Sequence, residues 1–173
     1  MAAYLTFDKG SPEHTKLLEW WRDLEKDRGG RAELRRSKSL TEIALLPAYH
    51  RLRLSILHLE DYEGIKGIQE EGLMLVAGLA ARVKTNNDVM NIAEQMAASE
   101  AGGNTAVVSD LRFRRLLKAN KGEELYMLMT RAISLLGSSV DLQSLAKSVY
   151  WWNDRTKKDW AYSYYTKAPA KKA

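Results

Sequence analysis

The chain has 173 residues, enough to bury a core as one domain or as two closely packed helical lobes. Lys and Arg number 27 against 22 Asp and Glu, and this net charge of +5 favours anionic partners. The absence of cysteine excludes a disulfide scaffold, an iron–sulfur cluster, a cysteine-ligated zinc site and a cysteine nucleophile. The N-terminus lacks a signal-peptide pattern, and the longest apolar run, Leu73 to Ala81, is shorter than a membrane span. We therefore expect a cytoplasmic protein without a membrane segment.

Helical spacing of apolar residues begins near the N-terminus. Ser11 and Pro12 are typical of a helix N-cap and its first residue. Leu17 and the tryptophans that follow lie on one stripe of this helix, which we expect to stop at Gly29-Gly30. A strongly basic segment follows the glycines.

Further helix boundaries divide residues 39–84. Ser39 or Thr41 is expected to open a short apolar helix, which must end near Pro47 because the residue before a proline avoids the helical region. A longer helix starts at Pro47 and is broken by the glycines of residues 64–67. A long apolar helix then runs to about Lys84.

The second half of the chain is divided by turns. Residues 86–88 (Asn-Asn-Asp) predict a turn and a cap for the next helix, and residues 99–109 predict a mobile connection. The stretch Ser109–Lys121 is expected to be helical, and another helix follows it. Asp141 is expected to cap one final long helix that ends near Tyr165.

These segments predict an all-α fold, a two-lobed bundle of roughly eight or nine helices. No run of alternating apolar residues is long enough to predict a strand. We assign residues 1–101 to an N-terminal helical lobe, residues 102–166 to a C-terminal helical lobe, and residues 167–173 to a basic, disordered tail.

No group of residues in the sequence favours catalysis. A phosphate-binding glycine loop, a dinucleotide fingerprint and a His-Glu-x-x-His motif are all missing. His50 and His58 are eight residues apart, whereas paired metal ligands usually lie three or four apart. The adjacent pairs Glu70-Glu71 and Glu123-Glu124 point to different sides of a helix and do not converge as an acid/base pair. We expect no catalytic residue, no metal site and no cofactor.

The helix predicted over Ser109–Lys121 has an unusual charge pattern. No acidic residue follows Asp110, so i,i+4 pairing would leave the cations without partners, whereas a merely solvated helix usually mixes signs. This pattern favours a surface that binds an anion. The five basic residues of the stretch are Arg112, Arg114, Arg115, Lys118 and Lys121.

The final helix offers a second basic surface. Cations and aromatic rings share one of its sides, an arrangement suited to phosphate contact with base stacking. The same rings would equally suit packing between two neighbouring helices. The residues on this side are Lys147, Trp151, Arg155, Lys158, Tyr162 and Tyr165.

The order of motifs resembles the CasB family, the small subunits of the type I-E CRISPR surveillance complex Cascade. The resemblance extends from about Lys16 to Tyr165. Its most specific parts are SDLRFRRLL and the terminal YWWNDRTKKDWAYSYY; the others are the Trp20-Trp21 pair, RAELRR, LLPAYHRL, LMLVAGLAARV and AEQMA.

The resemblance implies an all-helical, two-lobed protein without enzymatic activity. In this family two copies sit head to tail against the subunits that carry the guide RNA, and their basic surface helps to hold the displaced non-target DNA strand and to stabilise the R-loop. It therefore implies four partners: the guide-carrying backbone subunits, the large subunit, a second copy of the chain, and the displaced non-target strand.

The family's basic motif positions correspond to particular residues of this chain. Lys157 lies near the apolar side of its helix and is left out of the binding set, whereas the charge pattern adds Lys118. The expected nucleic-acid-binding residues are Arg31, Arg35, Arg36, Arg51, Arg112, Arg114, Arg115, Lys118, Arg155 and Lys158. We expect the terminal helix to carry more of the strand contact, and the LRFRRLL helix to be shared with subunit docking.

Two other functions stay open. One is a protein–protein scaffold whose basic faces dock partner subunits without contacting nucleic acid, and DNA binding by the isolated chain would argue against it. The other is a small nuclease or nucleotide-handling enzyme, which the missing ligand cluster disfavours. A metal-dependent turnover assay tests the second.

Overall fold

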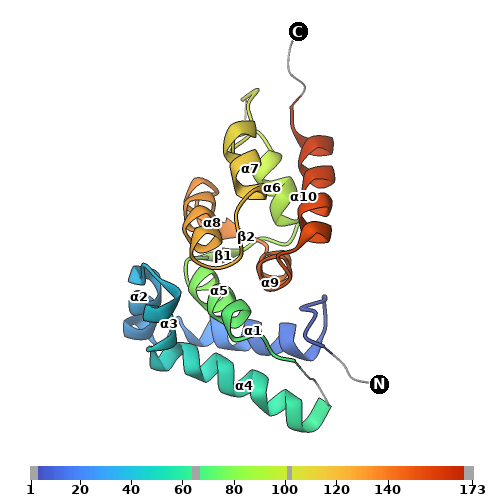
Figure 1. Ribbon diagram of the computed structural model, residues 1–173. Helices are drawn as coiled ribbons and strands as arrows, with labels where there is room; N and C mark the ends of the chain where they lie inside the picture. Colours follow the sequence, from blue (N-terminus) through green and yellow to red (C-terminus); the bar gives the residue numbers. More distant parts are fainter. Residues whose placement is uncertain (1–3, 64–66, 101–102, 170–173) are drawn as a thin grey trace.

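The computed structural model describes residues 4–63, 67–100 and 103–169, and in these residues it contains ten helices and one pair of two-residue strands (Figure 1). The all-α prediction is confirmed, with slightly more helices than the eight or nine expected. The elements are α1 (Pro12–Asp23), α2 (Arg28–Arg36), α3 (Leu40–Ala44), α4 (Pro47–Glu63), α5 (Glu70–Ala80), β1 (Thr85–Asn86), α6 (Ile92–Ala97), α7 (Asp110–Leu117), α8 (Glu123–Leu135), β2 (Ser139–Val140), α9 (Leu142–Tyr150) and α10 (Asp154–Lys167).

Serine caps begin three of these helices. The side chains of Ser11, Ser39 and Ser109 each accept a hydrogen bond from the backbone N–H three residues further on, at 3.2, 3.1 and 3.3 Å. Each bond satisfies one of the N–H groups that have no partner within the helix. Of the two expected openings of α3, the structure therefore selects Ser39.

The first helix ends earlier than its pattern predicts. It stops at Asp23, and Gly29 and Gly30 lie inside the first turn of α2. The carboxylate of Asp27 accepts the Gly30 N–H at 3.0 Å and caps this new helix. A Cβ at position 30 would lie 2.2 Å from the Asp27 carboxylate, so glycine leaves room for the cap and does not end a helix.

The chain also turns before Lys84, where the sequence predicted that the apolar helix would end. Helix α5 ends at Ala80, and the Lys84 N–H then donates to the Ser138 carbonyl at 2.8 Å, leading into β1. Strand β1 pairs in parallel with β2, Thr85 opposite Ser139. Two-residue strands are too short to produce an alternating pattern in the sequence.

The cap of α6 is also not where the sequence placed it. Asn91, and not the turn of residues 86–88, accepts the Glu94 N–H at 2.9 Å, and Glu94 returns a bond to the Asn91 N–H at 3.2 Å. Two other predicted breaks, at residues 64–67 and within 99–109, include residues 64–66 and 101–102, which lie outside the described residues.

The predicted final helix is two helices. Asn153 accepts the Thr156 N–H at 3.0 Å and so starts α10, three residues after α9 has ended. A helical wheel drawn across both segments is therefore wrong, and Trp151 lies in the break and not on the outer face of α10. Helix α10 continues to Lys167, the first residue of the expected tail; residues 170–173 lie outside the described part of the chain.

One connected apolar core extends from Leu5 to Tyr164, and α5 runs through its middle. Figure 1 shows α1 to α4 at one end of the molecule and α6, α7, α8 and α10 at the other, with α5 and α9 between them. Helix α6, assigned to the N-terminal lobe, packs against α10. The lobe boundary at residues 101 and 102 lies outside the described residues and stays a prediction.

Candidate nucleic-acid interface

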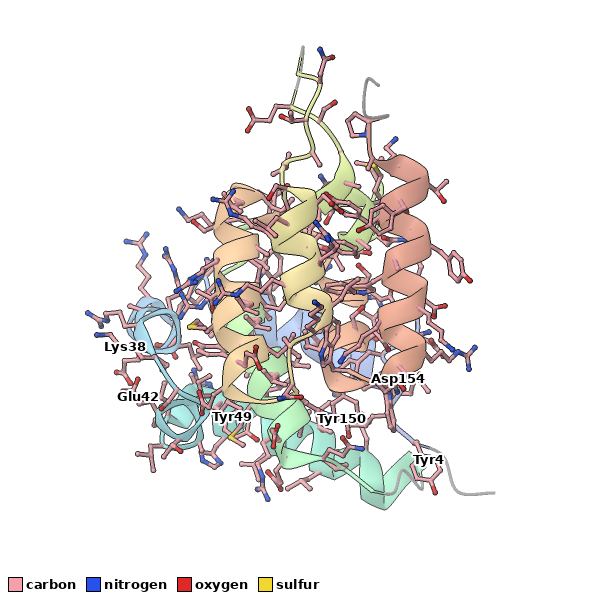
Figure 2. The ribbon with its side chains drawn as sticks, turned by 45° about the horizontal axis from the view of Figure 1, so that its top comes forward. Tyr4, Lys38, Glu42, Tyr49, Tyr150 and Asp154 are labelled. Atoms are coloured by element: carbon pink, nitrogen blue, oxygen red, sulfur yellow. The ribbon has the colours of Figure 1, made fainter. Side chains whose placement is uncertain are left out.

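Three helices of the C-terminal half form the side of the molecule that faces the viewer in Figure 2, with α7 between α8 and α10. Phe113 of α7 packs its ring on Tyr164 of α10, with centroids 3.8 Å apart. Phe113 and Leu116 are both buried. Because these two residues fix the inner face of α7, the residues between them point to solvent.

The exposed face of α7 carries three cations without carboxylate partners. Arg112, Arg115 and Lys118 are exposed, and within the described residues none of them forms an ion pair. For these three residues the sequence correctly predicted that no carboxylate of the helix pairs with them, whereas the binding of an anion stays a prediction.

Two other cations of the stretch behave differently. Arg114 pairs with Asp110 one turn earlier, Nε to Oδ2 at 3.2 Å, so the expectation of a wholly unpaired helix is wrong for this residue. The Tyr165 hydroxyl also donates to Asp110, at 2.6 Å. Lys121 does not join the exposed cations of α7, because its Nζ donates to Gln69 Oε1 at 2.8 Å and to the Tyr150 carbonyl at 2.6 Å. Burial lowers the pKa of this ammonium.

Arg131 of α8 adds a cation that the sequence analysis did not identify. It is exposed, and together with Arg112 and Arg115 it lines a recess between α7 and α8. In the sequence it is a lone cation in an apolar helix, and only the packing of α8 against α7 places it beside the other two.

The expected nucleic-acid-binding residues of the N-terminal half fall into two groups: two are exposed without an ion-pair partner among the described residues, and two bond to other groups of the protein. Arg35 and Arg36 are exposed at the end of α2, and neither has an ion-pair partner in the described ranges. Arg31 instead donates to the Ala81 carbonyl at 3.3 Å and to the Val83 carbonyl at 2.7 Å, just beyond the end of α5. Arg51 is paired with Asp27.

Helix α10 presents a separate basic face. Arg155, Lys158 and Tyr162 are exposed, the tyrosine to 75%. The Lys157 ammonium lies over the Trp152 ring, 5.6 Å from its centroid, which agrees with leaving Lys157 out of the binding set.

Two aromatic residues expected on this face are engaged elsewhere. The Trp151 Nε1–H donates to the Leu5 carbonyl at 2.6 Å, and Tyr165 is held by Asp110. Burial first, and then Asp110, raises the pKa of Tyr165. Tyr162 is therefore the ring of this set that is most available for stacking on a base.

The described residues contain no cluster of three or more His, Cys, Asp or Glu that could hold a metal ion. The His50 ring in the first turn of α4 bonds to the carbonyl of Ala44, the last residue of α3, at 2.6 Å. Among the helices that the structure describes, none is both long and apolar enough to cross a membrane.

The fold and surface define a small, basic, all-helical protein. The model of the CRISPR-associated protein Cse2 family matches residues 30–165, and the chain belongs to this family, as its CasB-like motifs predicted. The crystal structure of CasB from Thermus thermophilus has a similar fold, with a TM-score of 0.61, 21% sequence identity, and coverage of 90% of this chain and 99% of that chain. No curated protein matches the chain. Family membership makes the chain a subunit of the CRISPR Cascade complex.

Proposed function

We propose that this chain is a non-catalytic small subunit of Cascade that holds the displaced non-target DNA strand on basic helical surfaces and stabilises the R-loop. The observation that carries the proposal is the group of exposed cations at the junction of α7 and α8, Arg112, Arg115 and Arg131, which have no carboxylate partner among the described residues.

Unpaired cations suit this role. A displaced strand has no fixed sequence, so its holder needs contacts to phosphates and stacking on bases, and not readout of base edges. Each phosphate contact releases condensed counterions. An arginine already paired with a carboxylate, such as Arg51, would first have to give up that pair. Because R-loop formation is nearly balanced in free energy, a few backbone contacts are enough to stabilise it.

The outer face of α10 provides a second contact in this proposal. Arg155 and Lys158 offer charge, and Tyr162 offers an exposed ring for stacking. Because the other rings are engaged, α10 supplies one stacking residue beside its two cations. We therefore assign the larger share of the strand contact to the three arginines of the α7–α8 junction, and not to the terminal helix as the sequence favoured.

A protein-docking role is the second candidate function, and exposed apolar side chains favour it. Leu111 is 72% exposed beside the basic residues of α7, and Leu45 and Leu54 are 76% and 60% exposed at the other end of the molecule. Apolar side chains at the centre of a surface patch are typical of protein interfaces. In this alternative the basic faces dock on the guide-carrying backbone subunits, the large subunit or a second copy of the chain.

Three double variants, each removing two positive charges, test the proposal. They are Arg112→Ala with Arg115→Ala on α7, Arg155→Ala with Lys158→Ala on α10, and, as a control, Arg22→Ala with Lys26→Ala at and just after the end of α1. All six side chains are exposed, so folding should be preserved. Fluorescence anisotropy with a single-stranded oligonucleotide measures the slope of log K against log salt. Each lost phosphate contact should flatten this slope by about 0.7. We expect a larger change for the α7 and α10 pairs than for the control.

The outcomes separate the two functions. Binding that does not depend on salt, or equal slopes in all three variants, contradicts strand holding. If the α7 variant binds DNA normally but no longer co-purifies with the other Cascade subunits, protein docking is the function of that face. Cleavage of DNA that follows the purified protein when magnesium or manganese is added would overturn the non-catalytic assignment.

A further inference from the structure

A recess of about 100 Å³ lies between α7 and α8, and its chemistry differs from its surroundings. The apolar side chains of its lining include Leu116 and Ala132, both nearly fully buried. The charged side chains of its lining are three arginines: Arg112, Arg115 and Arg131. No carboxylate belongs to the lining.

Two larger hollows elsewhere on the surface contain charges of both signs. The hollow between α1 and α4 includes Asp23 and Asp27 with its cations. The hollow beside Leu45 includes Glu71 and Glu123 with Lys121. In both, acidic and basic groups compensate one another, whereas the recess between α7 and α8 has uncompensated positive charge around an apolar floor. Its complement is a molecule with an apolar body and negative charge beside it.

The size of the recess limits that molecule further. An enclosed apolar cavity of about 150 Å³ holds one benzene molecule. The α7–α8 recess, at about 100 Å³, is smaller and partly open to solvent, so it suits one partly inserted six-membered ring better than a fused bicyclic ring and is far too small for a peptide helix. A nucleotide of single-stranded DNA has this combination of a flat ring and adjoining phosphates, and arginine planes commonly stack on unpaired bases.

We infer that the recess between α7 and α8 binds one pyrimidine base of single-stranded DNA, with Arg112, Arg115 and Arg131 contacting the neighbouring phosphates. This inference rests on the proposed function and adds to it a position and a base class. A base seated among Val108, Leu128 and Ala132 would fix the strand at that point on the surface, while phosphate contacts alone would leave it free to slide.

The test compares single strands that have the same number of phosphates and differ only in their bases. Three fluorescein-labelled strands are used: thymidine, deoxyadenosine and abasic. The protein is compared with Ala132→Leu, which fills the recess and keeps all three arginines. We expect native protein to bind the thymidine strand at least about fivefold more tightly than the abasic strand. In Ala132→Leu this ratio should fall sharply while the salt slope stays unchanged.

Two further variants each remove one positive charge, the first inside the recess and the second outside it. Arg131→Gln should reduce both the thymidine-to-abasic ratio and the salt slope, whereas Arg155→Gln should reduce the slope alone. Photocrosslinking of a 5-iododeoxyuridine strand to native protein gives a readout that does not depend on the folding of any variant. The crosslinks should map to residues 108–116 or 128–135.

The outcomes distinguish failure of the inference from failure of the proposed function. If native protein binds none of the strands, both fail. If it binds with a normal salt slope, but the base preference survives in Ala132→Leu and the crosslinks map elsewhere, only the recess assignment is overturned. If Ala132→Leu keeps its base preference and loses assembly with the other Cascade subunits, the recess is a protein-docking site and the inference is wrong.

Discussion

Phe113 and Tyr164 stack face to face, with their ring planes 7° from parallel and their centroids 3.8 Å apart. The Tyr164 hydroxyl also donates to the Val108 carbonyl at 2.6 Å, immediately before α7. Tyr164 therefore fixes both the start of α7 and its inner face. Because the inner face is fixed, Arg112 and Arg115 are held beside α8, where they line one recess with Arg131.

Removing the Tyr164 hydroxyl should destabilise the protein. In Tyr164→Phe the stack is kept, but the buried Val108 carbonyl loses the hydrogen bond that the Tyr164 hydroxyl donates to it. We expect the free energy of unfolding to fall by about 1–3 kcal/mol. Urea unfolding monitored by circular dichroism measures the change. Tyr162→Phe is the matched control, because this side chain is 75% exposed and its loss should change stability by no more than about 0.5 kcal/mol. Equal effects in the two variants would contradict the assignment.

Tyr164 should also make the protein sensitive to alkaline pH. Burial, and then the charges of Asp110 and Tyr165, raise the pKa of Tyr164 to about 12. An unfolded tyrosine has a pKa of about 10. Because the folded pKa is higher, this contribution to stability is complete below about pH 10 and is lost as the pH rises toward 12.

The contribution of this tyrosine is isolated by measuring the free energy of unfolding against pH for native protein and for Tyr164→Phe and taking the difference. The raised pKa of Tyr49, which does not depend on Tyr164, is present in both proteins and cancels in the difference. The free energy of unfolding should decrease more steeply between pH 9 and pH 11 in native protein. Parallel curves for the two proteins would show that Tyr164 does not contribute.

Two helical glycines should respond in opposite directions to substitution by alanine. A Cβ at Gly78 would lie 2.3 Å from Ile43 Cδ1 and 2.9 Å from the Tyr126 ring, inside the core. Gly78→Ala should therefore destabilise by about 1–3 kcal/mol through overpacking. Gly29 has no atom within 4 Å of a Cβ, so Gly29→Ala should stabilise by up to about 1 kcal/mol. Thermal unfolding compares them, and a stabilised Gly78→Ala protein would argue against the close packing of α5.

Variants of Arg31 and Arg35 should distinguish a cation that stabilises the fold from one that is available to bind DNA. Arg31→Ala removes the charged donor from the Ala81 and Val83 carbonyls and should cost about 1.5–3 kcal/mol of stability. Arg35→Ala changes an exposed residue and should cost no more than about 0.5 kcal/mol. If α2 contacts DNA, Arg35→Ala alone should flatten the salt slope. A flattened slope in Arg31→Ala, with unchanged stability, would reverse these roles.

Local signals predicted most of the helices. Ser11 acts as a cap where the sequence predicted one, and Ser39 is one of the two openings that it offered for α3, because a capping bond needs only a backbone N–H three residues away. The predictions failed where two local signals competed. Asp27 starts a helix across two glycines, and Asn153 interrupts an otherwise continuous apolar stripe, although neither change alters the helical period enough to be seen in the sequence.

The candidate site was harder to predict from local signals than the helices were. The sequence by itself determined which residues are basic, that α7 has no acidic residue after its first turn, and which family the motifs resemble. Only the tertiary structure decided which cations are available. Arg31, Arg51 and Lys121 are engaged by groups 20 or more residues away, at Val83, Asp27 and Gln69, and Arg131 joins Arg112 and Arg115 across two helices. The physical reason is that a charge becomes free or paired through contacts between segments distant in the chain, and helical periodicity describes only neighbours within about one turn.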